Sequence, residues 1–477
     1  MSARLSYWIG GSSRSGMARA CWKGCPPPRS SSATGWMSGA KWRNSSRCTA
    51  SARRFLGARL EPSAIGHQCR LLMAEGRWPL TRRDGEFGLT GFSRRVGALP
   101  TYPMAELPAI KRRLIEQGVD LIDVGAGDAD FPPPEVAVKA LTRALQDPAM
   151  SRYAFQLGLP AFREAAAAYM QRRFGVSVDP FKELHPLLGS KEGIAHLATA
   201  VLNPGDVAIV PVPGYAVYHG GTVLADAEPY LYNLTPRNDF LLELDGIPAD
   251  VLKRAKLVYL NYPNNPTAAV APREYLERVI AACRTHDLVL AYDNPYCEIT
   301  FDGYVAPSIF EIPGAMDVAV EFHSLSKSFC MAGWRLGWAV GRADRIAALA
   351  RVKNYVDTGA FLAVQAAGAE VMKQAERIAS GYAAQFKERR DAILPALRAN
   401  GFEVEPPRAT LYVWIPLPDG LASAAFQKRA LEDVGVVTLP GSAFGAGAEG
   451  FFRIALTVPI PRLIEATERL GKVLATV

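Results

Sequence analysis

One lysine in the chain lies where an amine could do covalent chemistry. Lys327 ends the run Ser324-Leu325-Ser326-Lys327, behind the apolar residues 317–322, and Arg335 follows eight residues after it. A lysine at the end of a buried strand loses hydration, which disfavours its ammonium form, and the neutral amine can then bond to an aldehyde. Arg335 and the Ser324 hydroxyl could both reach a phosphate near the same strand end. Pyridoxal phosphate carries both an aldehyde and a phosphate, and we expect this cofactor here; the alternative is an ordinary polar turn.

An acidic residue behind another apolar stretch is consistent with the same cofactor. Asp293 follows residues 288–292, which read as a buried strand. A carboxylate in such a position needs a cationic or hydrogen-bonding partner. A protonated pyridine nitrogen is such a partner, and the ion pair would keep the ring able to accept electrons when the Cα of an amino acid loses its proton. On this residue alone, a helix cap is an equally good interpretation.

Three further segments follow strand-like or turn-like stretches. Asn265, in a turn-rich Asn-Asn-Pro-Thr run, could donate a hydrogen bond to a ring oxygen together with Tyr296. The run Gly189-Ser190-Lys191-Glu192-Gly193 opens a helical pattern, so its backbone N–H groups could seat a phosphate. Tyr215 follows a Pro-Gly turn and could stack on a planar ring, although such a tyrosine more often packs in the core.

Length and composition describe an ordinary enzyme with an unusual beginning. A chain of 477 residues suits two or three domains, and no apolar stretch is long enough to span a membrane. Residues 1–60 hold eleven of the 54 basic residues and none of the 46 acidic ones, so the remainder is slightly acidic and is not expected to bind nucleic acid. The seven cysteines are scattered and predict neither a disulfide framework nor a metal site.

The first 90 residues lack sustained periodicity, and we expect little stable structure there. Abundant Arg and Ser without acidic residues is typical of an organelle transit peptide, while a start codon placed too far upstream explains it equally well, with Met73 as one candidate start. No apolar core of a secretory signal follows, so export is not expected. We expect a cytoplasmic protein, with organellar import as the alternative.

Beyond about Gly91, short β-rich runs alternate with helical patterns, which predicts a mostly parallel sheet. Helices are expected over residues 161–174 and 275–284. In such sheets, ligands bind where strands end at their carboxyl edges, which is where the residues above lie. The expected strands cover residues 121–124, 207–212, 256–260, 288–292, 318–322 and 337–340.

Taken together and in this order, these segments resemble the aspartate aminotransferase superfamily, the class I and II pyridoxal-phosphate aminotransferases of fold type I. The resemblance covers residues 92–477 and rests on Asn-Pro-Thr, Asp-x-x-Tyr and Ser-x-Ser-Lys with an arginine eight residues later. It implies an α/β fold with a large domain, whose mostly parallel seven-stranded sheet lies between helices, and a small α+β domain from both chain ends. The implied parts are an arm and part of the small domain at 91–134, the large domain at 135–375 and the rest of the small domain at 376–477.

The resemblance also implies roles for individual residues. Lys327 would bond to the cofactor and shuttle a proton, Asp293 would pair with the pyridine nitrogen, and Tyr215 would stack on the ring. A homodimer is implied, because Tyr153 matches the tyrosine that reaches the phosphate of the partner subunit. The remaining matches are Asn265 and Tyr296 at the ring oxygen, Ser190, Lys191, Ser324 and Arg335 at the phosphate, and Gly127, Asn265 and Arg453 at the substrate carboxylate.

The resemblance is closest to bacterial LL-diaminopimelate aminotransferases and their alanine and methionine aminotransferase relatives, which act on amino acids and 2-oxo acids. This chain has Gln156 near the position where the diaminopimelate enzymes usually carry a glutamate, which removes a plausible partner for a distal ammonium. Ala129 and Ala268 are smaller departures from the family pattern. Two other functions remain open: a C–S β-lyase on the same scaffold, and a transcription regulator, which would need a helix-turn-helix module before Gly91.

Overall fold

The computed structural model describes residues 92–100, 107–155 and 157–476. The expectations for residues 1–90, including the possible start at Met73, and the position of Gln156 lie outside these ranges. The described residues belong to one compact unit that spans Leu80–Val477. None of their helices is long and apolar enough to cross a membrane.

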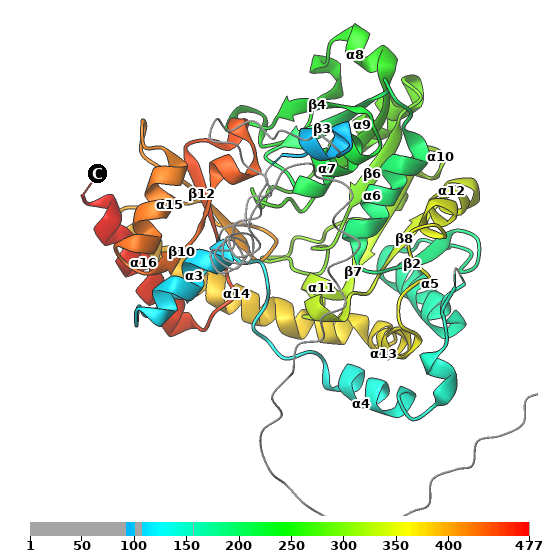
Figure 1. Ribbon diagram of the computed structural model, residues 1–477, viewed down its shortest axis with the longest axis horizontal. Coiled ribbons are helices and arrows are strands. Elements are labelled where there is room, and N and C mark those ends of the chain that lie inside the picture. The colour runs from blue at the N-terminus through cyan, green and yellow to red at the C-terminus, as the bar shows by residue number, and fades with distance from the viewer. Residues whose placement is uncertain (1–91, 101–106, 156, 477) are drawn as a thin grey trace, which may run out of the picture. The chain divides into compact units, whose positions relative to one another are not determined.

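A seven-stranded sheet forms the larger part of the described chain (Figure 1). Its strand order is β2-β8-β7-β6-β5-β3-β4, and β8 alone runs against its neighbours. The expectation of a mostly parallel seven-stranded sheet is therefore confirmed. The strands are β2 (Leu184–Leu187), β3 (Val207–Val212), β4 (Glu228–Asn233), β5 (Ala255–Leu260), β6 (Val289–Asp293), β7 (Ala319–Ser324) and β8 (Gly337–Gly341).

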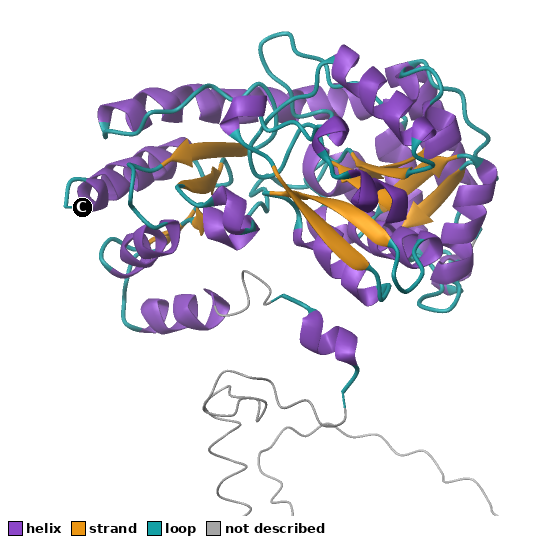
Figure 2. Ribbon diagram, turned by 90° about the horizontal axis from the view of Figure 1, so that it is seen from above, coloured by secondary structure: helices purple, strands orange, loops and turns teal. Residues whose placement is uncertain are grey.

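Helices cover both faces of this sheet (Figure 2). Alternate strand residues pack in opposite directions: Val210 and Phe322 face one group of helices, while Ile209 and Trp338 face the other. The near-continuous apolar strands follow from this double burial. On one face lie α6 (Ser190–Val201), α7 (Ala216–Leu224) and α12 (Ala343–Lys353); on the other lie α5 (Pro160–Phe174), α9 (Arg273–Thr285) and α13 (Leu362–Met372), with α4 (Glu135–Ala144) packed on α13.

A second, smaller core combines segments that precede the large sheet in the sequence with segments that follow it. The antiparallel sheet β11-β12-β9 and the parallel pair β1-β10 pack with three helices around Phe386, Phe426 and Phe452. The expected strand at residues 121–124 pairs here, through Ile122 and Val436, and not in the large sheet. The strands are β1 (Ile122–Asp123), β9 (Tyr412–Pro416), β10 (Val436–Val437), β11 (Leu439–Pro440) and β12 (Phe451–Ala455), and the helices are α14 (Ala375–Ala399), α15 (Ser423–Glu432) and α16 (Ile460–Leu474).

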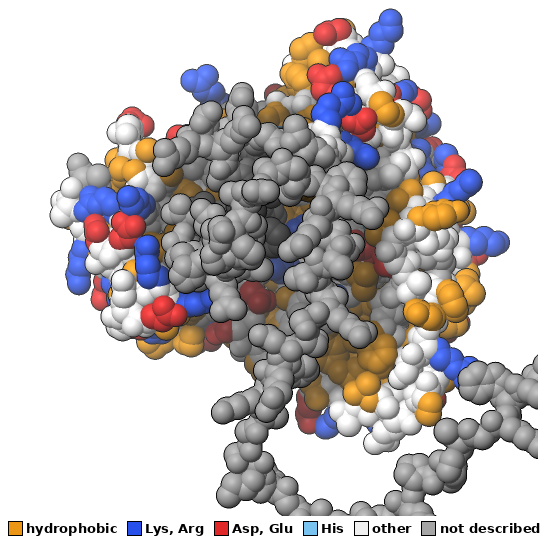
Figure 3. Space-filling model, in the orientation of Figure 1, with side chains coloured by type: hydrophobic (Ala, Val, Ile, Leu, Met, Phe, Trp, Pro, Cys, Tyr) orange, Lys and Arg blue, Asp and Glu red, His pale blue; other side chains and the backbone are white. Residues whose placement is uncertain are grey.

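The remaining helices are short or lie at connections. They are α2 (Arg94–Ala98), α3 (Leu107–Glu116), α8 (Ala249–Arg254), α10 (Ala315–Val318) and α11 (Leu325–Ser328). On the visible part of the described surface, basic and acidic side chains are interspersed (Figure 3).

The strands of the large sheet end beside one another at their carboxyl edge. Asp293 is the last residue of β6 and Ser324 the last of β7, one or two positions later than the expected strand ends. Asn261 follows the end of β5 directly. Because parallel strands finish at a common edge, polar residues far apart in sequence come together there.

Candidate active site

A cavity of about 490 Å³ lies at this carboxyl edge, between the large sheet and residues of the smaller core. Of the twelve residues predicted from the sequence, eleven line it. They are Gly127, Ser190, Lys191, Tyr215, Asn265, Asp293, Tyr296, Ser324, Lys327, Arg335 and Arg453. Tyr153 is the exception: its side chain is 70% exposed and does not line the cavity.

Lys327 projects into the cavity from α11, the single turn that follows β7. Ser324 caps this turn, because its Oγ accepts a hydrogen bond from the Ser326 backbone N–H at 3.1 Å. The Lys327 amine is half-buried and donates a hydrogen bond to the backbone carbonyl of Gly127. A flexible amine thus lies beside the loop that follows β1, and it has room to bond to a ligand in the cavity.

Arg335 lies at one end of the cavity with donors and hydroxyls around it. Its guanidinium donates to the Leu188 carbonyl at 3.0 Å and reaches Ser326 Oγ at 3.5 Å. Gly189, with φ of +80°, lies so close that a Cβ there would fall 2.6 Å from Arg335 Nη2. Next to it, Ser190 begins the twelve-residue helix α6. A guanidinium, serine hydroxyls and a helix N-terminus together suit a phosphate group.

Asp293 also lines the cavity and is almost completely buried. Its Oδ2 accepts a hydrogen bond from Tyr218 Oη at 2.8 Å, while Oδ1 has no hydrogen-bond partner at normal distance among the described residues. Burial raises the pKa of Asp293 to about 7, although the Tyr218 hydroxyl, the charge of His323 and the Ser190 hydroxyl act in the opposite direction. A buried carboxylate with a vacant acceptor oxygen suits a cationic N–H donor such as a protonated pyridine.

Arg453 enters the cavity from β12 and bridges two parts of the chain. It donates to Asn265 Oδ1 at 2.6 Å and to the Gly125 carbonyl at 2.7 Å. Among the described residues, its Nε has no hydrogen-bond partner and no acidic side chain forms an ion pair with its guanidinium. Burial lowers its pKa, yet a guanidinium stays charged at neutral pH. The site therefore presents a buried cation to a carboxylate ligand.

Two tyrosines lie beside Arg453 in the cavity. Tyr296 Oη and Tyr412 Oη lie 3.2 Å apart, and the Arg453 guanidinium lies 4.0 Å above the Tyr412 ring. Burial raises the pKa of Tyr296; the pKa of Tyr412 is lowered, because the charges of Arg453 and Lys327 outweigh its burial. Tyr412 also explains the small residue at position 127, since a Cβ on Gly127 would lie 2.2 Å from its hydroxyl oxygen.

The loop after β1 is held in place by a second buried arginine. Arg389 of α14 makes a two-pronged ion pair with Asp130, at 2.5 and 2.9 Å, and its guanidinium lies 4.0 Å over the Phe131 ring. On the other side of the loop, Thr457 Oγ1 donates to the Ala126 carbonyl at 3.1 Å. These contacts fix the backbone that receives the Lys327 amine.

The first turn of α6 is anchored by a buried charge cluster. Lys353, only 1% exposed, donates to Glu192 at 2.7 Å and to both carboxylate oxygens of Asp357 at 2.8 Å. His196 lies 2.6 Å from the second Glu192 oxygen. The ammonium thus occupies the position between the two carboxylates, and the cluster ties α6 to α12.

Four residues around the cavity were missed by sequence reasoning. Tyr412 lies far in sequence from the motifs, and Tyr218, in the helix that follows Tyr215, carries no local signal. Asn261 holds the Asn265 backbone N–H at 2.8 Å and donates to the Asp293 carbonyl at 2.7 Å; it lies only four residues before Asn265 in a run already noted. Ser326, inside the Ser-x-Ser-Lys motif, was recognisable from the same pattern.

Comparison with known proteins identifies the group to which this arrangement belongs. The family "Aminotransferase class I and II" matches residues 119–470. An LL-diaminopimelate aminotransferase of Moorella thermoacetica is 46% identical over 385 residues, which cover 81% of this chain and 99% of that protein. One from Syntrophobacter fumaroxidans is 46% identical over 80% of this chain and 98% of its own length. Among solved structures, a probable N-succinyldiaminopimelate aminotransferase of Thermus thermophilus has a TM-score of 0.73 and 40% identity, and the match covers 77% of this chain and 99% of that one. The chain belongs to the class I and II aminotransferases and is an enzyme of the transaminase type.

Proposed function

We propose that this aminotransferase works with pyridoxal phosphate bound in the cavity of Lys327. The observation that carries the proposal is the combination of three features in one cavity. These are a flexible amine at Lys327, a phosphate-type cluster around Arg335 and a buried carboxylate with a vacant oxygen at Asp293. When bound, the cofactor supplies an aldehyde for amine chemistry and a ring that accepts electrons.

The side chains that line the cavity then have separate roles in holding the cofactor. Arg335, Ser190, Lys191 and Ser324 hold the phosphate, and Tyr215 packs against the ring. Asp293 keeps the ring nitrogen protonated, while Asn265 and Tyr296 donate hydrogen bonds to the ring oxygen.

Lys327 has a second task once an amino acid is bound. With pyridoxal phosphate bound, the Lys327 amine would take the proton from the substrate Cα and would deliver it to the carbon of the cofactor that carried the aldehyde. Arg453 grips the substrate carboxylate beside Gly127 and so aligns Cα with the Lys327 amine. Water would release the first 2-oxo acid and the amino group would stay on the cofactor, from which a second 2-oxo acid would receive it in the reverse sequence.

Amino-acid donors and 2-oxo-acid acceptors are the proposed substrates. The names of the relatives suggest LL-diaminopimelate as donor, and the motifs also resemble alanine and methionine aminotransferases. The sequence and the names leave the choice of side chain open, because it depends on the walls of the cavity.

A homodimer is the proposed assembly, and the surface around Tyr153 supports it. Phe155 and Leu157 beside it are 64% and 68% exposed, and Tyr355 is 91% exposed. The two segments touch each other, since a Cβ on Gly359 would lie 2.8 Å from the Phe155 carbonyl oxygen. Large exposed apolar side chains in one place mark an interaction surface. In the dimer, Tyr153 would reach the phosphate of the partner subunit.

The domain division and the location of the protein also remain proposals. Pairing of β1 with β10 and the shared core around Phe452 support a small domain built from 91–134 and 376–477, next to a large domain at 135–375. The cytoplasm is the location that we propose from the sequence.

The proposal can be tested by absorbance spectroscopy. Purified enzyme mixed with single amino acids should convert its cofactor band to that of the aminated form, with one 2-oxo acid recovered per site. Lys327→Ala should lower the rate by several orders of magnitude. Lys373→Ala, which removes an exposed lysine, is the matched control and should change nothing. A Lys327→Ala enzyme with the normal rate, or release of ammonia without amino-group transfer, would contradict the proposal.

A further inference from the structure

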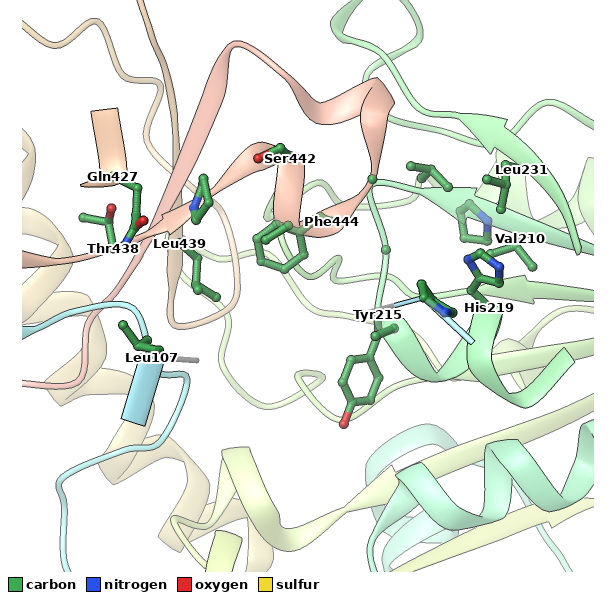
Figure 4. A pocket seen from close by; sticks show the side chains of 18 of the residues that line it. Leu107, Val210, Tyr215, His219, Leu231, Gln427, Thr438, Leu439, Ser442 and Phe444 are labelled. Carbon is green, nitrogen blue, oxygen red and sulfur yellow. The ribbon is translucent and has the colours of Figure 1, made fainter. Parts of the chain in front are cut away.

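A second cavity, of about 560 Å³, adjoins the one that contains Lys327 (Figure 4). The two cavities have six lining residues in common, so they share a wall. These residues are Gly214, Tyr215, Ala216, Leu439, Ala443 and Phe444. In Figure 4, Phe444 and Tyr215 lie in the middle of the view, with Leu107, Leu439 and Gln427 on one side and Val210, His219 and Leu231 on the other.

The described residues that line this second cavity carry no charged side chain. Nine of its nineteen described lining residues are leucine, isoleucine, valine or proline, and the members with polar groups are Gln427, Thr438, Ser442, His219 and Tyr215. Burial lowers the pKa of His219, which keeps its imidazole neutral at neutral pH. No Asp, Glu, Lys or Arg stands among the described residues that line the cavity.

Its position relative to Arg453 links this second cavity to the substrate. The Arg453 guanidinium lies 5.0 Å from the centre of the Phe444 ring, and the same ring lines the second cavity. An amino acid whose carboxylate is held by Arg453 has Phe444 next to it. Because Phe444 and Ala443 line both cavities, the side chain of that amino acid can extend past them into the second cavity.

We infer that the second cavity is the side-chain subsite of the enzyme and takes an uncharged, largely apolar side chain of the size found in methionine, leucine or phenylalanine. This inference rests on the proposed function and narrows its substrate. Apolar walls favour each added methylene by roughly fourfold in binding. The distal ammonium and carboxylate of LL-diaminopimelate would lose their water against walls whose described residues offer no opposite charge, which is strongly unfavourable.

A chain-length series tests the subsite. We would measure the rate of the first half-reaction per unit substrate concentration for alanine, 2-aminobutyrate, norvaline, norleucine, methionine and phenylalanine, and for LL-diaminopimelate and glutamate. The rate should rise severalfold with each methylene from alanine to norleucine, and LL-diaminopimelate should be at least tenfold poorer than norleucine. A flat series, or LL-diaminopimelate as the best donor, would overturn the inference.

A substitution in the wall that the two cavities share tests the second cavity directly. Ala443→Leu narrows the passage between the cavities and should lower the rate with norleucine and phenylalanine at least tenfold, while alanine changes less than threefold. Ala446→Leu, on the exposed next turn, is the matched control and should leave the whole series unchanged. Equal loss for long and short donors in Ala443→Leu would count against the subsite. Failure of every amino acid to react in the unaltered enzyme would instead refute the proposed function, so the two failures are distinguishable.

Discussion

Asp293 should make the cofactor-free protein less stable than a variant without the carboxylate. The residue is 3% exposed, its Oδ1 has no partner among the residues described, and burial raises its pKa to about 7 from an ordinary value of 3.8. Asp293→Asn keeps the shape and can still accept the hydrogen bond of Tyr218, but it removes the charge that burial disfavours.

The size and the pH dependence of this effect follow from the pKa. Between about pH 4 and pH 7 the folded protein binds more protons at Asp293 than the unfolded chain does, so this group lowers stability as the pH rises through that window. A difference of about three pKa units corresponds to about 4 kcal/mol above pH 7 and about 2 kcal/mol at pH 5. Since 1 kcal/mol shifts the Tm of a domain of 150–250 residues by roughly 2–4 °C, the expected gain is on the order of 10 °C at pH 8.

Thermal unfolding of the cofactor-free proteins at pH 5 and pH 8 is the assay. Asp293→Asn should unfold at the higher temperature, by a larger margin at pH 8, and should at the same time lose most of its transaminase rate and bind pyridoxal phosphate more weakly. Asp245→Asn, on the surface, serves as the control. An unchanged or lower Tm of Asp293→Asn at pH 8 would refute the burial argument, and a normal rate would refute the role of Asp293 at the ring nitrogen.

Three further substitutions have defined outcomes. Arg453→Lys loses the two-pronged grip on the carboxylate and should raise KM for amino acids roughly 10- to 100-fold with a smaller change in kcat, as steady-state kinetics would show. Arg335→Met should weaken cofactor binding by a similar factor, measured by fluorescence titration, and unchanged affinity would contradict the phosphate assignment. Lys353→Met leaves Glu192 and Asp357 without their shared cation and should cost about 3–5 kcal/mol of stability, whereas the exposed Lys373→Met should leave the Tm within about 1–2 °C.

The sheet was predictable where its strands are buried on both faces. Residues 207–212 form an unbroken apolar run, and the strand occurs at Val207–Val212 as expected. Two strands were missed for physical reasons. β4 is an edge strand with a largely exposed surface, and β2 contains Pro186, which argues against a strand in a pattern reading. The placement of β1 in the smaller core depends on a partner more than 300 residues away, which no local pattern specifies.

The site was predictable to the extent that its residues follow strand ends. Asp293, Asn265 and Lys327 could be inferred because each follows an apolar run that ends at the same edge of the sheet. Tyr412 could not, since its role comes from contacts with Tyr296 and Arg453, which are brought to it by the tertiary fold. Arg453 itself was inferred only through the family resemblance, because a single arginine in a short β-rich run carries no local signal.

The buried Arg453 has a consequence for which ligands the enzyme would discriminate against. Its guanidinium is 4% exposed and contacts amide and carbonyl oxygens and two aromatic rings, but no described carboxylate balances its charge. The protein thus contains an unbalanced buried cation, and in the proposed mechanism the carboxylate of an amino acid would balance it on binding. An amine of the same shape without a carboxylate would leave the buried charge of Arg453 without a counterion. If Arg453 has the proposed role, discrimination between amino acids and amines is present in the resting protein, before any bond to the substrate forms.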